Sequence, residues 1–162
     1  GIPDMKRFLT PLLLGLALLA PLPAAAQNAE ADNMRILREK MMGDKKLIVA
    51  ANMALTDAES KAFWPIYDAY QAELQKINEQ LGTIIADYAR MHNAGKLTDA
   101  RARALMDRYL GAEEAEVRLK RTFAKRLDKV LPGVKVTRYL QIENKIRAIV
   151  KYELAGEVPL AK

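Results

Sequence analysis

Hydrophobic positions recur along most of this chain at alternating spacings of four and three residues. The longest run comprises Phe63, Tyr67, Tyr70, Leu74, Ile77, Leu81, Ile84, Tyr88 and Met91. Such a pattern over four heptads predicts a continuous apolar face on one helix, about 42 Å long at 1.5 Å per residue. No alternating apolar–polar run and no Asn-Gly turn indicates a β-sheet. We therefore expect an all-α fold.

Three further runs predict additional helices. One precedes Gly43 and consists of Met34, Leu37 and Met41. The next has the residues Ala102, Leu105, Tyr109, Ala112, Leu119, Phe123, Leu127 and Val130. The last has Tyr139, Ile142, Ile146 and Ile149 and ends near Gly156. The segment 45–54 is ambiguous, since its apolar residues fit a helix, a turn or an extended chain.

The breaks between these runs are short and set the expected architecture. Residues 92–96 separate the two long helices, and 131–133 separate the third from the fourth. Short connections make consecutive helices antiparallel neighbours. We expect an elongated antiparallel helical hairpin, with a short first helix and a packed C-terminal helix. Pro65 either kinks the first long helix or marks its start, because proline removes a helical hydrogen bond but suits a first turn.

The N-terminus has the three parts of a secretory signal. A basic start at 5–7 precedes the apolar stretch 8–20, and small residues at 24–26 offer a cleavage site. The apolar stretch is shorter than the roughly 20 residues of a membrane span. We expect a signal peptide over 1–26 and one periplasmic domain over 27–162, beginning at Gln27. An uncleaved anchor is the alternative, and residues 1–4 match no signal pattern and are interpreted as an artefact.

Composition narrows the chemistry that the domain can perform. The chain has no cysteine and a single histidine, His92, which excludes disulfides, thiolate metal sites and paired imidazoles. Ser60 has no histidine near it in the sequence, and Glu113-Glu114 suits solvation better than acid–base catalysis. Met91 beside His92, or the methionines 34, 41 and 42, could hold a soft metal, although such spacing is more typical of core packing. We expect no enzyme activity and no cofactor.

Two helix starts share a Leu-Thr sequence. Leu55-Thr56 and Leu97-Thr98 each precede a long helical run. A threonine there caps free amide groups, and the aspartate that follows complements the helix dipole. Glu59 is placed to complete a capping box with Thr56, whereas Arg101 does not do so for Thr98.

These repeated starts resemble the LTxxQ motif of the Spy/CpxP-like periplasmic proteins. The resemblance covers roughly residues 30–152, with an exported leader, a short first helix and a hairpin whose long helices follow Leu-Thr. Glu59 and Arg101 stand where the motif has glutamine, so this chain resembles a divergent branch. The family includes ATP-independent chaperones, envelope-stress regulators and metal-responsive sensors. The resemblance implies Leu55, Thr56, Leu97 and Thr98 as the motif residues.

Charge is distributed unevenly along the chain. Residues 117–151 contain 11 basic and 2 acidic residues. Within this segment Arg118, Arg121, Lys125 and Lys129 fall within about 80° on a helical wheel, opposite the predicted apolar face. The basic face is either ordinary solvated surface or a binding surface. An acidic or unfolded protein, or an anionic membrane, suits an exported chain better than nucleic acid does.

Two function classes follow from these features. The first is a holding chaperone, expected to be a curved helical homodimer that binds unfolded periplasmic proteins through Arg118, Arg121, Lys125 and Lys129. The second is a stress sensor that binds the periplasmic domain of one membrane signalling protein. A purely structural helical module is the simplest alternative.

Overall fold

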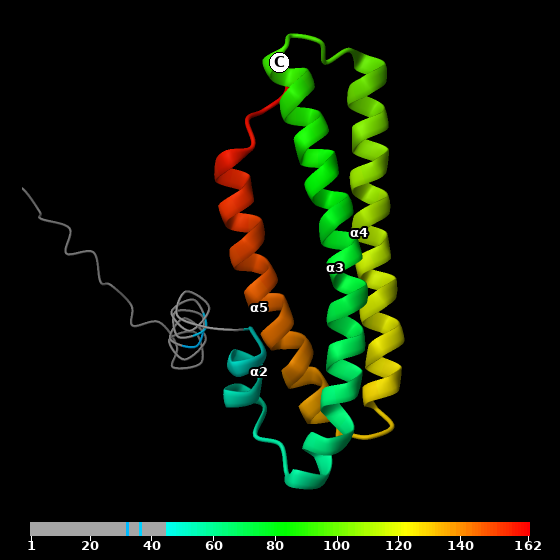
Figure 1. The fold of residues 1–162 in the computed structure, drawn as a ribbon, viewed down its shortest axis with the longest axis vertical. Helices are drawn as coiled ribbons and strands as arrows, with labels where there is room; N and C mark the ends of the chain where they lie inside the picture. The colour runs from blue at the N-terminus through cyan, green and yellow to red at the C-terminus, as the bar shows by residue number, and fades with distance from the viewer. Residues whose placement is uncertain (1–31, 33–35, 37–44) are drawn as a thin grey trace, which may run out of the picture.

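In a computed structural model, the described residues 45–162 form an all-helical bundle (Figure 1). The structure also describes Asp32 and Ile36. The helices are α2 (Lys45–Met53), α3 (Asp57–Asn93), α4 (Asp99–Leu127) and α5 (Gly133–Glu157). The expected signal peptide at 1–26, its cleavage before Gln27 and the apolar run of Met34, Leu37 and Met41 lie outside the described residues. The ambiguous segment 45–54 is mainly helix α2.

The predicted hairpin is confirmed. Helices α3 and α4 pack against each other along their length and are joined by a short turn at Gly95 (Figure 1). The φ of Gly95 is 64°, in the left-handed region that favours glycine. Helix α5 then runs parallel to α3. Two contacts show this direction: Tyr139 packs against Phe63 near the N-terminal ends of the two helices, and the Pro159 carbonyl accepts a hydrogen bond from Tyr88 near their C-terminal ends.

Pro65 lies inside α3 rather than at its start. The helix begins eight residues earlier, at Asp57, and continues through the proline to Asn93. The alternative that the helix starts near Pro65 is therefore wrong. The reason is the cap at Thr56, which fixes the first turn more strongly than the preference of proline for a first-turn position.

Both Leu-Thr motifs are helix caps. The Thr56 side chain accepts a hydrogen bond from the Glu59 amide at 3.2 Å, and the Glu59 carboxylate accepts one from the Thr56 amide at 2.8 Å. This is the predicted capping box. Thr98 accepts only the Arg101 amide, at 3.4 Å. The two starts therefore differ in strength, as the residues at 59 and 101 predict.

We expect the Thr56→Ala substitution to lower the free energy of unfolding by about 1 kcal/mol. The Thr98→Ala substitution should cost less, because its capping contact is longer and has no reciprocal bond. Urea denaturation of both variants measures the difference. An equal loss in the two variants would show that the capping box at Thr56 adds nothing to the single cap.

The core has two parts with different numbers of helices around them. The larger part lies where α2, α3, α4 and α5 meet, and it contains the edge-to-face aromatic rings of Phe63, Tyr70 and Tyr139. Ile36 is also buried there. The smaller part lies between α3 and α4 alone and contains Ile77, Ile84, Leu105 and Ala112. Helix α5 leans away from α3 toward its C-terminal end (Figure 1).

This divergence corrects one expected core position. Tyr109 was predicted on the buried face of its helix, but it is exposed and donates a hydrogen bond to Glu113 at 3.1 Å. On a helical wheel of α4, Tyr109 lies close to the buried residues Leu105 and Ala112. Because the C-terminal half of α5 diverges from the hairpin, Tyr109 is only partly covered there, with 37% of its surface exposed. Burial of this position depends on the neighbouring helix and not on the periodicity of α4.

Candidate functional site

The basic face predicted from the sequence is an exposed face of α4. Arg118, Arg121 and Lys125 are exposed, whereas Phe123 and Leu127 on the opposite side are buried. Arg118 contacts Glu114 at 3.4 Å. Arg121 and Lys125 make no ion pair with a carboxylate in the part of the chain that the structure describes. The predicted amphipathic arrangement of the helix is confirmed.

Lys129 was expected on the basic face of the helix, but it lies beyond the end of α4. Helix α4 ends at Leu127, so Lys129 lies in the turn before α5 and is exposed there. The helix stops because Pro132 and Gly133 follow closely, and a residue before proline disfavours helical dihedral angles. Lys129 adds positive charge at the end of α4 but does not continue its helical face.

Apolar side chains share the basic side of α4. Met106, Leu110 and Val117 are 57%, 48% and 50% exposed. At 100° per residue they fall with Arg118, Arg121 and Lys125 in an arc of about 120°. We call these six residues the outer face of α4. It combines exposed hydrocarbon with cations that lie nearer the C-terminal end of the helix, and the exposed carboxylates Asp107 and Glu114 fall in the same arc.

The Leu-Thr motif residues do not form one site. Thr56 begins α3 and Thr98 begins α4, and these two starts lie at opposite ends of the hairpin (Figure 1). Leu55 packs against the larger core and Leu97 against the smaller one. In the described part of the molecule, the motif therefore has a local role in helix capping and packing.

The inner side of the bundle holds a buried carboxylate that the sequence analysis missed. Glu143 of α5 is 3% exposed. Its Oε1 accepts hydrogen bonds from the Tyr139 hydroxyl at 2.9 Å and from Gln71 at 2.8 Å. Its Oε2 lies 2.7 Å from the Lys45 ammonium. This one carboxylate ties α2, α3 and α5 together.

A second buried carboxylate, Glu116 of α4, is 5% exposed. Its Oε2 accepts Arg147 Nε at 3.0 Å and Nη2 at 2.5 Å, and its Oε1 lies 2.8 Å from Lys120. Arg147 Nη1 also donates to the Asn78 side chain at 2.7 Å. Burial opposes ionisation of Glu116, but the hydrogen bonds from Lys120 and Arg147 outweigh it, so its pKa is lowered. The carboxylate is therefore ionised at neutral pH.

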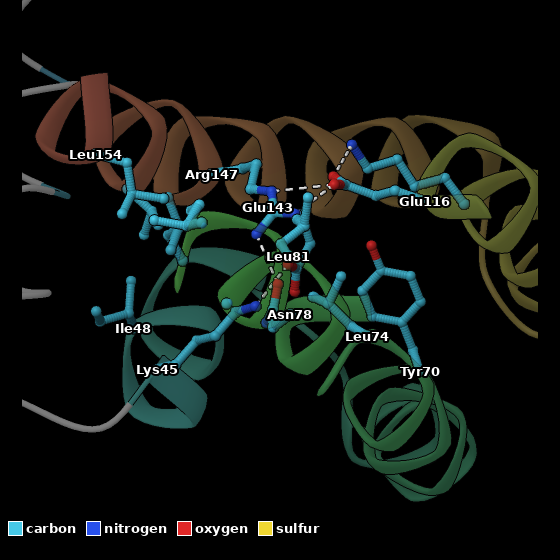
Figure 2. Close-up of a pocket in the computed structure, with 15 residues that line it drawn as sticks. Lys45, Ile48, Tyr70, Leu74, Asn78, Leu81, Glu116, Glu143, Arg147 and Leu154 are labelled. Carbon is cyan, nitrogen blue, oxygen red and sulfur yellow. Dashed lines mark hydrogen bonds and ion pairs between the residues drawn. The ribbon is translucent and has the colours of Figure 1, made fainter. Parts of the chain in front are cut away.

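A cavity of about 500 Å³ opens beside these two carboxylates (Figure 2). Aliphatic side chains form much of its wall, among them Leu74, Leu81, Ile85, Ile146, Val150 and Leu154. Lys45, Lys120 and Arg147 also line it. The size and the mainly apolar lining are typical of small-molecule sites.

Tyr70 lines the same cavity and is 1% exposed. Its hydroxyl has no hydrogen-bond partner among the described residues. In Figure 2 this hydroxyl points away from α3, toward the side where Glu116 lies. Burial, followed by the charges of Glu143 and Glu116, raises the pKa of Tyr70, so the hydroxyl keeps its proton and can donate.

Met91 and His92, the possible soft-metal ligands, lie at the end of α3. The His92 ring stacks on Tyr88 with centroids 5.6 Å apart, and Met91 packs against the smaller core. Among the described residues, no three His, Cys, Asp or Glu side chains are grouped as metal ligands. The methionines 34, 41 and 42 lie outside the described residues.

Among the described helices, none is both long and apolar enough to cross a membrane.

One signal in the sequence could have located the buried carboxylates. The apolar run of α4 skips from Ala112 to Leu119, and Glu116 occupies the missing position of the four–three spacing. Glu143 likewise lies four residues after Tyr139 and three before Ile146. A charged residue in register with an apolar face is rarely buried without a partner.

Comparisons with protein-family models, curated proteins and solved structures give no match to this chain.

Proposed function

We propose that this protein is an ATP-independent holding chaperone of the periplasm, of the Spy/CpxP-like type. In this proposal it binds unfolded or acidic client proteins through the outer face of α4. One observation carries the proposal: on this face Arg121 and Lys125, which have no carboxylate partner among the described residues, share one side of α4 with apolar side chains that are about half exposed.

The apolar residues and the cations of the outer face supply different parts of the binding. Cations attract an acidic chain over a distance of about 10 Å at 0.1 M salt, which raises the rate of encounter. Met106, Leu110 and Val117 offer exposed hydrocarbon that retains apolar segments of the client. Methionine is flexible enough to pack against many different sequences. A surface of this kind is suited to weak binding of many clients rather than tight binding of one.

Charge reversal on the outer face tests the proposal. We expect the triple variant Arg118→Glu, Arg121→Glu and Lys125→Glu to lose most protection of reduced α-lactalbumin, an acidic client, at low salt. Arginine, lysine and glutamate have similar helix propensities, so the fold should survive, with a small loss because the helix dipole favours cations at the C-terminal end. Light scattering follows aggregation of the client, and thermal melts check the fold of the variant.

A matched control variant reverses three exposed lysines away from α4, namely Lys61, Lys96 and Lys162. It changes the net charge by the same amount and should protect the client almost as well as the wild type. Equal protection by the α4 variant and the wild type at low salt would show that the outer face is only solvated surface. A pull-down from periplasmic extract that yields one tight partner and no others would favour the stress-sensor alternative.

A further inference from the structure

The cavity between α3 and α5 lies apart from the outer face of α4. Helix α4 contributes to it only through Glu116 and Lys120 on its inner side. Lys45 and Ile48 of α2 line it from another direction. The cavity and the outer face therefore use different residues.

The polar groups in the cavity have a surplus of positive charge and of hydrogen-bond donors. Three cations, Lys45, Lys120 and Arg147, face two carboxylates whose oxygens all have partners. An ammonium group has three donors. Among the described residues, Lys45 uses two of them, on Gln71 and Glu143, and Lys120 uses one, on Glu116. One more negative charge would balance the site.

The Tyr70 hydroxyl strengthens this conclusion. A buried hydroxyl without a partner costs free energy that a phenylalanine at the same position would avoid. Tyr70 is nevertheless enclosed by the core, and it is one of the residues that border the cavity. The group is thus a donor that lacks an acceptor in the described structure.

The two ends of the cavity differ in polarity and in exposure. Tyr70 and Arg147 at its polar end are largely buried, whereas Val150 and Leu154 belong to the more exposed C-terminal part of α5. Figure 2 shows Leu154 at the opposite side of the view from Tyr70 and Glu116. A ligand of matching chemistry therefore has a small anionic head at the buried end and a hydrocarbon chain toward Leu154.

We infer that this cavity binds a free fatty acid, with the carboxylate held by Tyr70, Lys45 and Lys120 and the acyl chain between α3 and α5. The distance along α5 from Glu143 to Leu154 is about 16 Å at 1.5 Å per residue, which accommodates a medium-length chain. The tail after α5 crosses back to α3, where the Pro159 carbonyl accepts a hydrogen bond from Tyr88 at 2.7 Å (Figure 1).

Calorimetric titration with laurate, below its micelle concentration, tests the inference on the full chain. We expect saturable binding at one site and a rise in the melting temperature with laurate. Dodecylamine has a matched chain but the opposite charge, and it should bind at least tenfold more weakly. Acetate has the carboxylate without the chain and should not bind measurably.

Two variants locate the binding in the cavity. Tyr70→Phe removes only the hydroxyl, and it should weaken laurate about tenfold while leaving the ligand-free melting temperature unchanged or higher. Gly82→Leu fills a wall position where a Cβ meets nothing within 4 Å, and it should abolish binding while the helix becomes more stable. Gly111→Leu is the matched control, since Gly111 is a helical glycine on α4 that does not line the cavity.

The outcomes separate the cavity from other sources of affinity. Equal laurate binding by wild type, Tyr70→Phe and Gly82→Leu would show adsorption to exposed apolar surface and overturn the inference. Equal binding of dodecylamine would overturn the charge argument. Absence of laurate binding to the wild type would overturn the inference of a fatty-acid site. It would point to an occupant other than a fatty acid, such as a peptide segment. The charge-reversal variant of the outer face should bind laurate as the wild type does. The laurate experiment therefore tests the cavity separately from the chaperone proposal.

Discussion

Replacing Arg147 by methionine is expected to lower the free energy of unfolding by about 3 kcal/mol. The Arg147 guanidinium makes two of the hydrogen bonds to Glu116 and one to Asn78, and both Glu116 and Arg147 are largely buried. Removal of one partner from a buried ion pair typically costs 3–5 kcal/mol, because the other charge stays buried. We expect the lower end of this range, since Lys120 still contacts Glu116. Thermal melts should show a fall of about 10 °C.

The double variant Glu116→Leu with Arg147→Met is the control for this prediction. It removes both charges and replaces them with apolar groups, so it should be more stable than Arg147→Met alone and close to the wild type. Lys120 loses its partner but retains access to water, with 26% of its side chain exposed. If the double variant is as unstable as the sum of the two single variants, the pair is not energetically coupled.

The same pair makes stability depend on pH. Because the pKa of Glu116 in the folded chain lies below its ordinary value of 4.5, its ionised form stabilises the fold above that pH. This contribution is lost as the pH falls from about 4.5 through the lower pKa of the folded state. Between about pH 5 and pH 3, the melting temperature of the double variant should therefore fall less than that of the wild type. Parallel curves for the two proteins would contradict this assignment.

Replacing Phe63 by alanine is expected to cost about 3–5 kcal/mol, the typical range for deleting a buried aromatic ring. Phe63 is completely buried, and its ring packs edge to face against Trp64 at 4.9 Å and Tyr139 at 5.1 Å between centroids. The loss includes the cavity left behind and the aromatic contacts between α3 and α5. Urea denaturation measures it through the midpoint, with the slope unchanged.

The Phe63→Leu variant is the control for the size of this effect. Leucine retains much of the volume, so the loss should be about 1.5 kcal/mol or less. Trp64→Ala gives a second comparison, because Trp64 is only partly buried although it is larger. A loss below about 1 kcal/mol for Phe63→Ala would mean that the neighbouring side chains collapse into the space.

The local features of the fold followed from the sequence. The four–three spacing predicted α3 and α4, and six of the seven residues that it selects from Phe63 to Ile84 are buried, whereas Leu81 is partly buried. Thr56 and Thr98 marked the helix starts, and Glu59 predicted the capping box. These features depend on residues within one or two helical turns, so their spacing in the sequence is also their spacing in space.

The candidate site depended on the tertiary structure. Glu116 meets Arg147 across 31 residues and Lys45 meets Glu143 across 98, and no local rule pairs residues so far apart. The exposure of Tyr109 and the cavity beside Tyr70 both follow from the divergence of α5 from α3, which packing between whole helices decides. By itself the sequence determined where the two long helices begin and which of their faces are apolar, because capping contacts and helical periodicity are local. Only the tertiary structure decided which of their charges are buried together, because burial depends on what the neighbouring helices cover.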